Sequence, residues 1–305
     1  MRFSFGRNNL ALTVFVPWDC ENACKFCTSK RSYLMSPANV DRVIYQLRNI
    51  FRRYQFPIKD VVISGGEPMM DIRELRNLCM EIPDDKNIYI NTTLVNRNLE
   101  EFLDFLNNSK KINGVNISRH GNTIEDDRKM LCDIADDSVI QQIKVPVRIN
   151  CLNGIGDLDR VLNRWSGTGV HLCIREDYRN VKMCDTRNLH DPFAEIPMRL
   201  ITLGYRFWSH TGCHVCDTLT FEKGNDIVSY HRGLPMTSLE SYDELEINDL
   251  VIDQSGLFSY DWGFSRADVL YQLEEAFRKP VDMFRNLENI GIRSKIEYCG
   301  STSGC

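Results

Sequence analysis

The sequence CENACKFC, residues 20–27, places three cysteines within a short segment, and Phe26 precedes the last of them. The three are spaced C-x3-C-x2-C: Cys20, Cys24 and Cys27. Thiolates this close together can bind three irons of a four-iron cluster and leave the fourth iron without a protein ligand. Such an iron can take up a substrate or cofactor, as the open position of a catalytic zinc site does. A structural zinc site is the alternative, but it usually closes with a nearby Cys or His, and neither occurs in 28–78.

A second motif, Gly65-Gly66-Glu67-Pro68, follows the apolar run 61–64. This pattern predicts a buried parallel strand whose glycine pair lets the backbone approach a ligand, with a carboxylate beside it. Together with the cysteine spacing, the motif resembles the radical S-adenosylmethionine (SAM) superfamily. The resemblance implies that SAM chelates the open iron through its amino and carboxylate groups. It further implies that Gly65, Gly66, Glu67 and Pro68 form the element that holds the SAM ammonium.

Composition favours a folded chain that works in a reducing environment. The 305 residues are 43% hydrophobic and 26% charged, which is enough to build a core. The net charge of −5 and the lack of a long basic run do not favour nucleic-acid binding. The N-terminal sequence MRFSFGRNN has no apolar signal region, and no apolar stretch is long enough to span a membrane. Twelve cysteines without a signal segment indicate metal sites in a cytoplasmic protein.

Six strand–helix units follow one another along the first two thirds of the chain. The strands are predicted at 10–18, 60–64, 88–94, 115–120, 145–151 and 170–175. The first helix is predicted to begin with Ser36 as its N-cap and Pro37 as its first residue. Five further helices are predicted near 71–82, 98–108, 123–135, 156–165 and 191–203. Repeated units of this type predict an α/β fold with a helix-covered parallel sheet. The family resemblance specifies a partial (β/α)6 TIM-like barrel with ligands at the C-terminal ends of its strands.

Polar residues at three of these strand ends are candidate SAM contacts. Small polar side chains are unexpected on a buried parallel strand unless they face a ligand. By position they resemble the family's contacts to the ribose and carboxylate of SAM. The candidates are Thr92 after the third strand, Ser118 and Arg119 at the end of the fourth, and Asn150 on the fifth. Satisfying the backbone of nearby loops is the alternative role for such residues.

A second group of cysteines follows residue 204. Cys213 and Cys216 precede a hairpin pattern, and a similar strand–turn–strand pattern recurs at 250–263. A helix is expected near 265–288. C-x2-C before a hairpin resembles the Twitch or SPASM auxiliary-cluster extension of radical SAM enzymes. That resemblance implies a second 4Fe-4S cluster that is held by Cys213 and Cys216 and completed by Cys299 and Cys305. Cys184 is the alternative ligand. A zinc ion is the alternative metal. The expected domains are 1–204, the barrel, and 205–305, a small extension of β-hairpins and a helix.

The resemblance implies an enzyme, of oxidoreductase or lyase type, that cleaves SAM reductively with an external flavodoxin- or ferredoxin-type electron donor. The resulting 5′-deoxyadenosyl radical abstracts hydrogen from the substrate, and the auxiliary cluster assists oxidation or rearrangement. A small polar substrate, nucleotide- or sugar-like, is the first hypothesis. A ribosomal peptide that is cross-linked, oxidised or epimerised is the alternative. A non-catalytic iron–sulfur regulator is a further hypothesis, although a regulator would not need the GGEP element.

Overall fold

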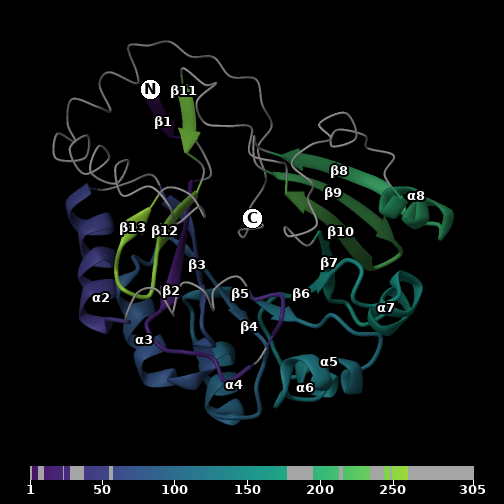
Figure 1. The fold of residues 1–305 in the computed structure, drawn as a ribbon, viewed down its shortest axis with the longest axis horizontal. Coiled ribbons are helices and arrows are strands. Elements are labelled where there is room, and N and C mark those ends of the chain that lie inside the picture. The colour runs from purple at the N-terminus through teal and green to yellow at the C-terminus, as the bar shows by residue number, and fades with distance from the viewer. Residues whose placement is uncertain are drawn as a thin grey trace.

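The computed structural model describes residues 2–5, 10–22, 24–27, 38–54, 58–176, 195–212, 216–233, 244–247 and 249–259. Figure 1 shows a strongly curved sheet with helices along its outer side. Six neighbouring parallel strands form the centre of the sheet in chain order, which confirms the predicted partial barrel. They are β2 (Leu10–Val16), β3 (Ile58–Gly65), β4 (Asn87–Thr92), β5 (Ile112–Ser118), β6 (Val147–Leu152) and β7 (His171–Arg175).

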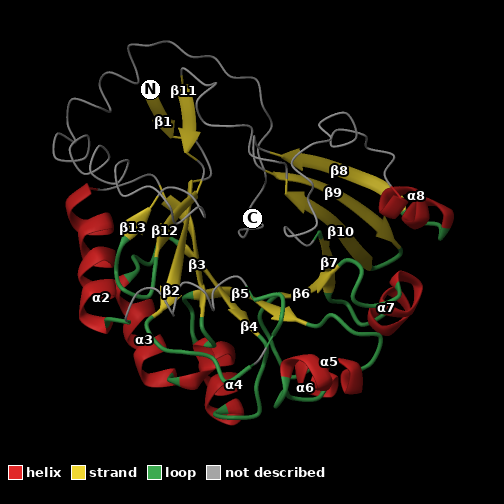
Figure 2. Ribbon diagram, viewed as in Figure 1, coloured by secondary structure: helices red, strands yellow, loops and turns green. Residues whose placement is uncertain are grey.

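Helices follow these strands and cover the outer face of the sheet (Figure 2). The α-helices are α2 (Val40–Arg48), α3 (Ile72–Glu81), α4 (Leu99–Asn108), α5 (Ile124–Leu131), α6 (Asp137–Ile140), α7 (Leu158–Trp165) and α8 (Glu195–Thr202). A π-helical turn, Asn49–Tyr54, continues α2, and a short 3-10 helix, Pro68–Met70, follows β3. The N-cap of α2 is Asn39, whose side chain accepts from the amide of Arg42 at 2.9 Å. The prediction that Ser36 caps this helix is therefore wrong for α2. Ser36 and Pro37 themselves lie outside the described residues.

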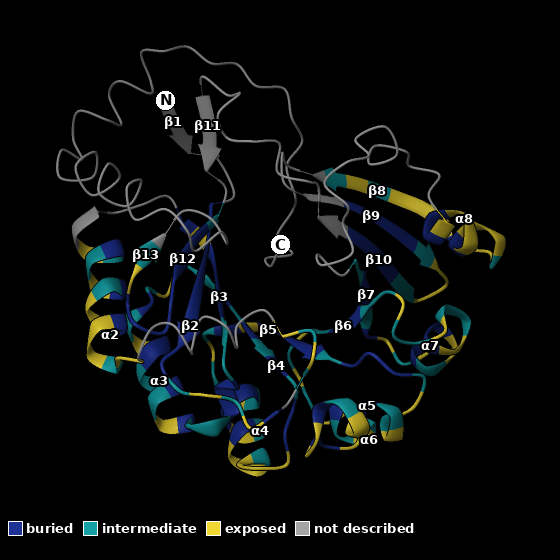
Figure 3. Cartoon of the chain, viewed as in Figure 1, coloured by how far each residue is buried: buried dark blue, intermediate teal, exposed yellow. Residues whose placement is uncertain are grey.

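Figure 3 shows buried residues along the strands and on parts of the helices. Alternation along each strand places apolar side chains in the core between the strands and the helices. On β6, for example, Ile149 and Cys151 belong to this core. The intervening Arg148 and Asn150 therefore face the opposite side of the sheet. This side, turned away from the helices, is called the inner face.

Both predicted hairpins are present, and they extend the two edges of the same sheet. The first consists of β9 (Cys216–Lys223) and β10 (Asp226–Gly233), and β10 pairs in parallel with β7. The second consists of β12 (Asp249–Ile252) and β13 (Phe258–Ser259), and β12 pairs in parallel with β2. The hairpins thus lie on opposite sides of the parallel strands. The expected helix near 265–288 lies outside the described residues.

Three further strands complete the described sheets. Strand β8 (Arg206–Gly212) pairs with β9, while β1 (Arg2–Phe5) and β11 (Glu244–Ile247) form a separate parallel pair. The turn of the second hairpin also contacts α2, because the amide of Asn39 donates to the carbonyl of Gln254 at 2.9 Å. In the described ranges, no helix combines the length and apolar character needed to cross a bilayer.

Candidate radical SAM site

The glycine pair after β3 brings this strand end against the segment that leads into the cysteine loop. Gly65 has a φ of 99°, which a residue with a side chain adopts only with strain. A Cβ on Gly66 would lie 2.1 Å from the carbonyl oxygen of Trp18, so only glycine fits there. The indole Nε1 of Trp18 also donates to the carbonyl of Glu67 at 2.9 Å. The two sequence motifs are therefore in direct contact.

The three cysteines of the loop are the ligands that the sequence predicts for the cluster. Cys20 and Cys24 are half-buried and Cys27 is exposed, and the amide of Cys27 donates to the carbonyl of Cys24 at 3.2 Å. Burial, supported by the charges of Glu67, Cys24 and Cys27, raises the pKa of Cys20 to about 12. A thiol with a pKa as high as that of Cys20 needs a nearby cation in order to ionise, and bound iron provides one. Within the described ranges, no three His, Cys, Asp or Glu side chains are gathered closely enough to enclose a metal ion.

The carboxylate of Glu67 is buried and already accepts four hydrogen bonds from the chain. Oε1 accepts from the hydroxyl of Thr92 at 2.5 Å and from the amide of Met69 at 3.2 Å. Oε2 accepts from the amide of Thr93 at 2.8 Å and from its hydroxyl at 2.7 Å. Burial raises the pKa of Glu67, and these hydrogen bonds oppose that rise. Since a carboxylate offers about four acceptor positions, Glu67 ties β3 to the end of β4.

Arg119 is likewise enclosed by acceptors of the chain. Its side chain is 0% exposed, and its guanidinium donates to the carbonyls of Thr93, Ser118 and Ala135 at 2.6, 2.9 and 2.9 Å. A fourth bond, at 3.3 Å, reaches Asp137. Burial lowers the pKa of Arg119, while the nearby carboxylates oppose this. The structure gives Thr92 and Arg119 bracing contacts, and their predicted contact with SAM stays a prediction.

The loop after β5 touches the cysteine loop through two rings. The rings of Phe26 and His120 meet edge to face, with centroids 4.6 Å apart. His120 is buried, and its Nδ1 accepts from the amide of Leu152 at 3.1 Å. Burial lowers the pKa of His120 to about 4, so the ring is neutral at pH 7. Sequence reasoning did not predict this contact, because an aromatic pair distant in sequence leaves no local pattern.

Ser118 and Asn150 lie side by side on the inner face, as register partners of β5 and β6. Within the described chain, the side-chain Oδ1 of Asn150 is buried and has no hydrogen-bond partner. A buried acceptor in this state is costly unless a ligand or water satisfies it. Asn150 is therefore the predicted SAM contact whose surroundings most favour a ligand.

The predicted auxiliary site falls largely outside the described residues. Cys213, Cys299 and Cys305 are not among them, nor is the reserve ligand Cys184. Cys216 begins β9, opposite Gly233 of β10. The ligand set of a second cluster stays a prediction.

Comparison with known proteins agrees with the geometry. Residues 19–134 match the family model described as the Radical SAM superfamily. The fold is similar to a crystal structure of Streptococcus suis SuiB bound to S-adenosylmethionine, with a TM-score of 0.56 and 13% identity over 87% of this chain and 61% of SuiB. Another SuiB structure gives a TM-score of 0.54 and 12% identity over 88% of this chain and 66% of that one.

A SuiB structure with its precursor peptide SuiA matches less well, with a TM-score of 0.44 and 16% identity over 57% of this chain and 40% of that one. The chain thus spans less than two thirds of the SuiB chains, and no curated protein matches it. Residues 19–134, which contain the cysteine loop, the glycine pair and the ends of β3 to β5, form a domain of the radical SAM superfamily.

Proposed function

We propose that this chain is a radical SAM enzyme that acts on a peptide. The observation that carries the proposal is the contact between the two motifs, where Gly66 packs against the carbonyl of Trp18 at the entrance to the cysteine loop. When bound, a 4Fe-4S cluster supplies the electron that cleaves SAM to methionine and a 5′-deoxyadenosyl radical. Membership of the superfamily implies both SAM and this cluster.

The residues of the chain divide the binding task between them. Cys20, Cys24 and Cys27 would hold three irons, leaving the fourth for SAM. The backbone of Gly65 to Pro68 would border the amino group of SAM, with Glu67 keeping that backbone in place through its bonds to β4. Ser118 and Asn150 would face SAM from the inner face, where the buried Oδ1 of Asn150 can accept a hydrogen bond.

The peptide is favoured over a small polar substrate because of the likeness in fold to SuiB. SuiB binds SAM and, according to another structure, a precursor peptide. The resemblance in fold extends over 87% of this chain, well beyond the segment that matches the family model. A nucleotide- or sugar-like substrate has no comparable support. The peptide hypothesis therefore replaces the small molecule as the first choice.

Cleavage of SAM by anaerobically reconstituted and reduced protein tests the proposed activity. Wild type is expected to release 5′-deoxyadenosine and methionine, whereas Cys24→Ala should release none, because the cluster loses an iron ligand. Cys132→Ala is the matched control, since Cys132 is exposed and lies away from the loop. Cleavage by Cys24→Ala at the wild-type rate would refute the assignment of the loop.

The second cluster and its extension, residues 205–305, belong to the same proposal. Wild type should then carry about eight irons per chain, and a triple Cys20, Cys24 and Cys27 to Ala variant about four. One zinc and no iron in the triple variant would refute the auxiliary cluster. If truncation before Cys299 leaves the iron count unchanged, the remaining ligands of the auxiliary cluster must be Cys184 or another residue.

A further inference from the structure

A ring nitrogen beside the cysteine loop has no hydrogen-bond partner within the described part of the chain. It is Nε2 of His120, a residue of the loop after β5 that is only 4% exposed. The other ring nitrogen, Nδ1, accepts from the amide of Leu152 at 3.1 Å. With Nδ1 as an acceptor, the proton of the neutral ring is on Nε2. His120 therefore presents an N–H donor that no described residue accepts, and such a buried group is costly unless a ligand or water satisfies it.

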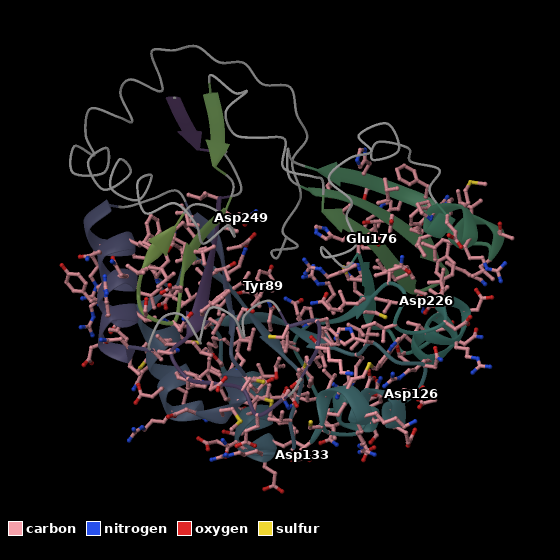
Figure 4. The ribbon with its side chains drawn as sticks, viewed as in Figure 1. Tyr89, Asp126, Asp133, Glu176, Asp226 and Asp249 are labelled. Carbon is pink, nitrogen blue, oxygen red and sulfur yellow. The ribbon has the colours of Figure 1, made fainter. Side chains whose placement is uncertain are left out.

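The backbone that carries this ring is fixed from the outer side of the sheet. Oδ1 of Asp127, on α5, accepts from the amides of His120 and Gly121 at 2.6 and 2.8 Å. Oδ2 of the same buried carboxylate accepts from Arg164 at 2.6 Å. Figure 4 shows Asp126, the preceding residue of α5, on the outer side of the sheet. The chain itself therefore positions the ring of His120, and no ligand is needed to orient it.

A second group without a partner among the described residues lies near His120, and it is an acceptor. This group is the buried Oδ1 of Asn150 on β6. Leu152, whose amide holds the ring of His120, follows Asn150 by two residues on the same strand. Two residues of a strand span about 7 Å. The unused acceptor and the ring with the unused donor are therefore anchored about 7 Å apart at the end of β6.

A nucleoside matches this pair of groups in size and in chemistry. Ribose hydroxyls can donate to Oδ1 of Asn150, and the ring nitrogens of a base can accept from Nε2 of His120. A sulfur of the cluster is the other acceptor expected near the cysteine loop, but it cannot donate to Asn150. The ribose and adenine of SAM combine both requirements in one molecule.

We propose that Nε2–H of His120 donates a hydrogen bond to the adenine of SAM, while Oδ1 of Asn150 accepts one from the ribose. The inference rests on the proposed function and adds a binding residue to its SAM site. The ring of His120 also meets the ring of Phe26, the residue before Cys27, with centroids 4.6 Å apart. His120 would therefore link the nucleoside of SAM to the loop that holds the cluster.

Three substitutions of His120 separate the donor from the packing of the ring. His120→Asn places an oxygen near the position of Nδ1, where it can still accept from Leu152, but removes the donor at Nε2. His120→Gln keeps an N–H donor near the position of Nε2. His120→Phe keeps a ring against Phe26 and removes both nitrogens. The control is His171→Asn, because His171 is a largely buried imidazole at the other end of its strand, the first residue of β7.

Equilibrium binding of radiolabelled SAM to anaerobically reconstituted, oxidised protein gives the main measurement. His120→Asn and His120→Phe should each weaken SAM binding about 3- to 10-fold, which is the effect of one neutral hydrogen bond. His120→Gln should bind SAM more tightly than His120→Asn, and His171→Asn should bind it as wild type does. Iron content and the midpoint potential of the SAM-free cluster should stay at their wild-type values, because the donor is directed at SAM.

Four results would overturn the inference. Wild-type affinity for SAM in His120→Asn and His120→Phe would mean that the ring only packs against Phe26. Equal affinities in His120→Asn and His120→Gln would mean that a donor at Nε2 is not recognised. A lower midpoint potential of the SAM-free cluster in His120→Asn and His120→Phe would assign the donor to a cluster sulfur. Loss of cluster iron in all three variants would mean that the ring supports the cysteine loop instead.

The proposed function is tested separately from this role of His120. Release of 5′-deoxyadenosine by wild type, and its loss in Cys24→Ala, do not depend on which residue contacts adenine. If wild type cleaves SAM and the His120 variants bind it normally, the role of His120 is wrong and the proposed function stands. If wild type neither binds nor cleaves SAM, both proposals are wrong.

Discussion

Polar residues have different surroundings in two regions of the barrel. One region lies near the cysteine loop, and the other lies near the first hairpin. Around Glu67 and Arg119, buried charges meet donors and acceptors of the chain itself. On β6, β7 and β10, strand register places Arg148 beside His171 and Arg175 beside His231 on the inner face. The first arrangement closes contacts between strand ends. The second gathers basic and imidazole side chains on one face of three neighbouring strands.

In the first group, polar residues shape the site by bracing the backbone. A carboxylate with all its acceptor positions used, such as that of Glu67, stabilises the backbone where β3 and β4 end. Asn150, whose Oδ1 lacks a partner among the described residues, lies between the two regions on β6. Substitutions of Glu67 and Arg119 should therefore cost mainly stability.

Arg119→Ala should give the largest effect on stability. The substitution leaves three buried carbonyl oxygens without their donor and Asp137 without one of its partners, which corresponds to a loss of about 3–5 kcal/mol in the free energy of unfolding. Anaerobic urea denaturation would measure it. The control is Arg128→Ala, which breaks an exposed pair with Asp136 and should cost less than about 1 kcal/mol. Equal losses in the two variants would contradict a bracing role for Arg119.

Sequence reasoning recovered the parallel strands and most helices because their patterns are local. The strand predicted at 60–64 is the centre of β3, and the helix predicted near 98–108 is α4. The hairpins were also predicted, but not their attachment to β7 and β2, since pairing across a sheet edge depends on distant segments. For the same reason the bonds of Glu67 to β4 could not be foreseen: their donors come from another strand.

Glu67→Gln should give a smaller loss, because the side chain keeps its size. An amide presents NH2 where a carboxylate oxygen now accepts two hydrogen bonds, so at least two buried donors lose their acceptor. The expected cost is about 2–3 kcal/mol. Exposed Glu100→Gln on α4 is the matched control and should stay within about 0.5 kcal/mol.

The same variant tests the role first assigned to Glu67. If the carboxylate bound the SAM ammonium directly, the affinity for SAM would fall about 10-fold or more while the cluster spectrum stayed intact. The bracing role predicts instead that stability falls and that SAM affinity follows only as the fold loosens. Equilibrium binding of SAM at a temperature well below the unfolding transition distinguishes the two. A large loss of affinity with wild-type stability would restore the direct contact.

The smallest effect concerns His171 at the start of β7, and it depends on pH. Its pKa is about 4 in the folded chain against 6.5 in the unfolded chain, so the folded state binds fewer protons. The stability that neutral His171 contributes is complete above pH 6.5 and is lost as the pH falls towards 4. Between pH 7.5 and 5.0 the loss should reach about 2 kcal/mol, at about 1.4 kcal/mol per pH unit below the unfolded pKa.

His171→Gln should remove this part of the pH dependence, because glutamine does not titrate. Its amide can still reach the hydroxyl of Ser229, which lies 2.7 Å from Nε2 of His171. His120 and His231 have lowered pKa values as well, so the wild-type slope contains their contributions, and only the difference between wild type and variant isolates His171. Urea denaturation at the two pH values gives that difference. Parallel slopes in the two proteins would mean that His171 is as easily protonated in the folded chain as in the unfolded one. The ring would then be open to water.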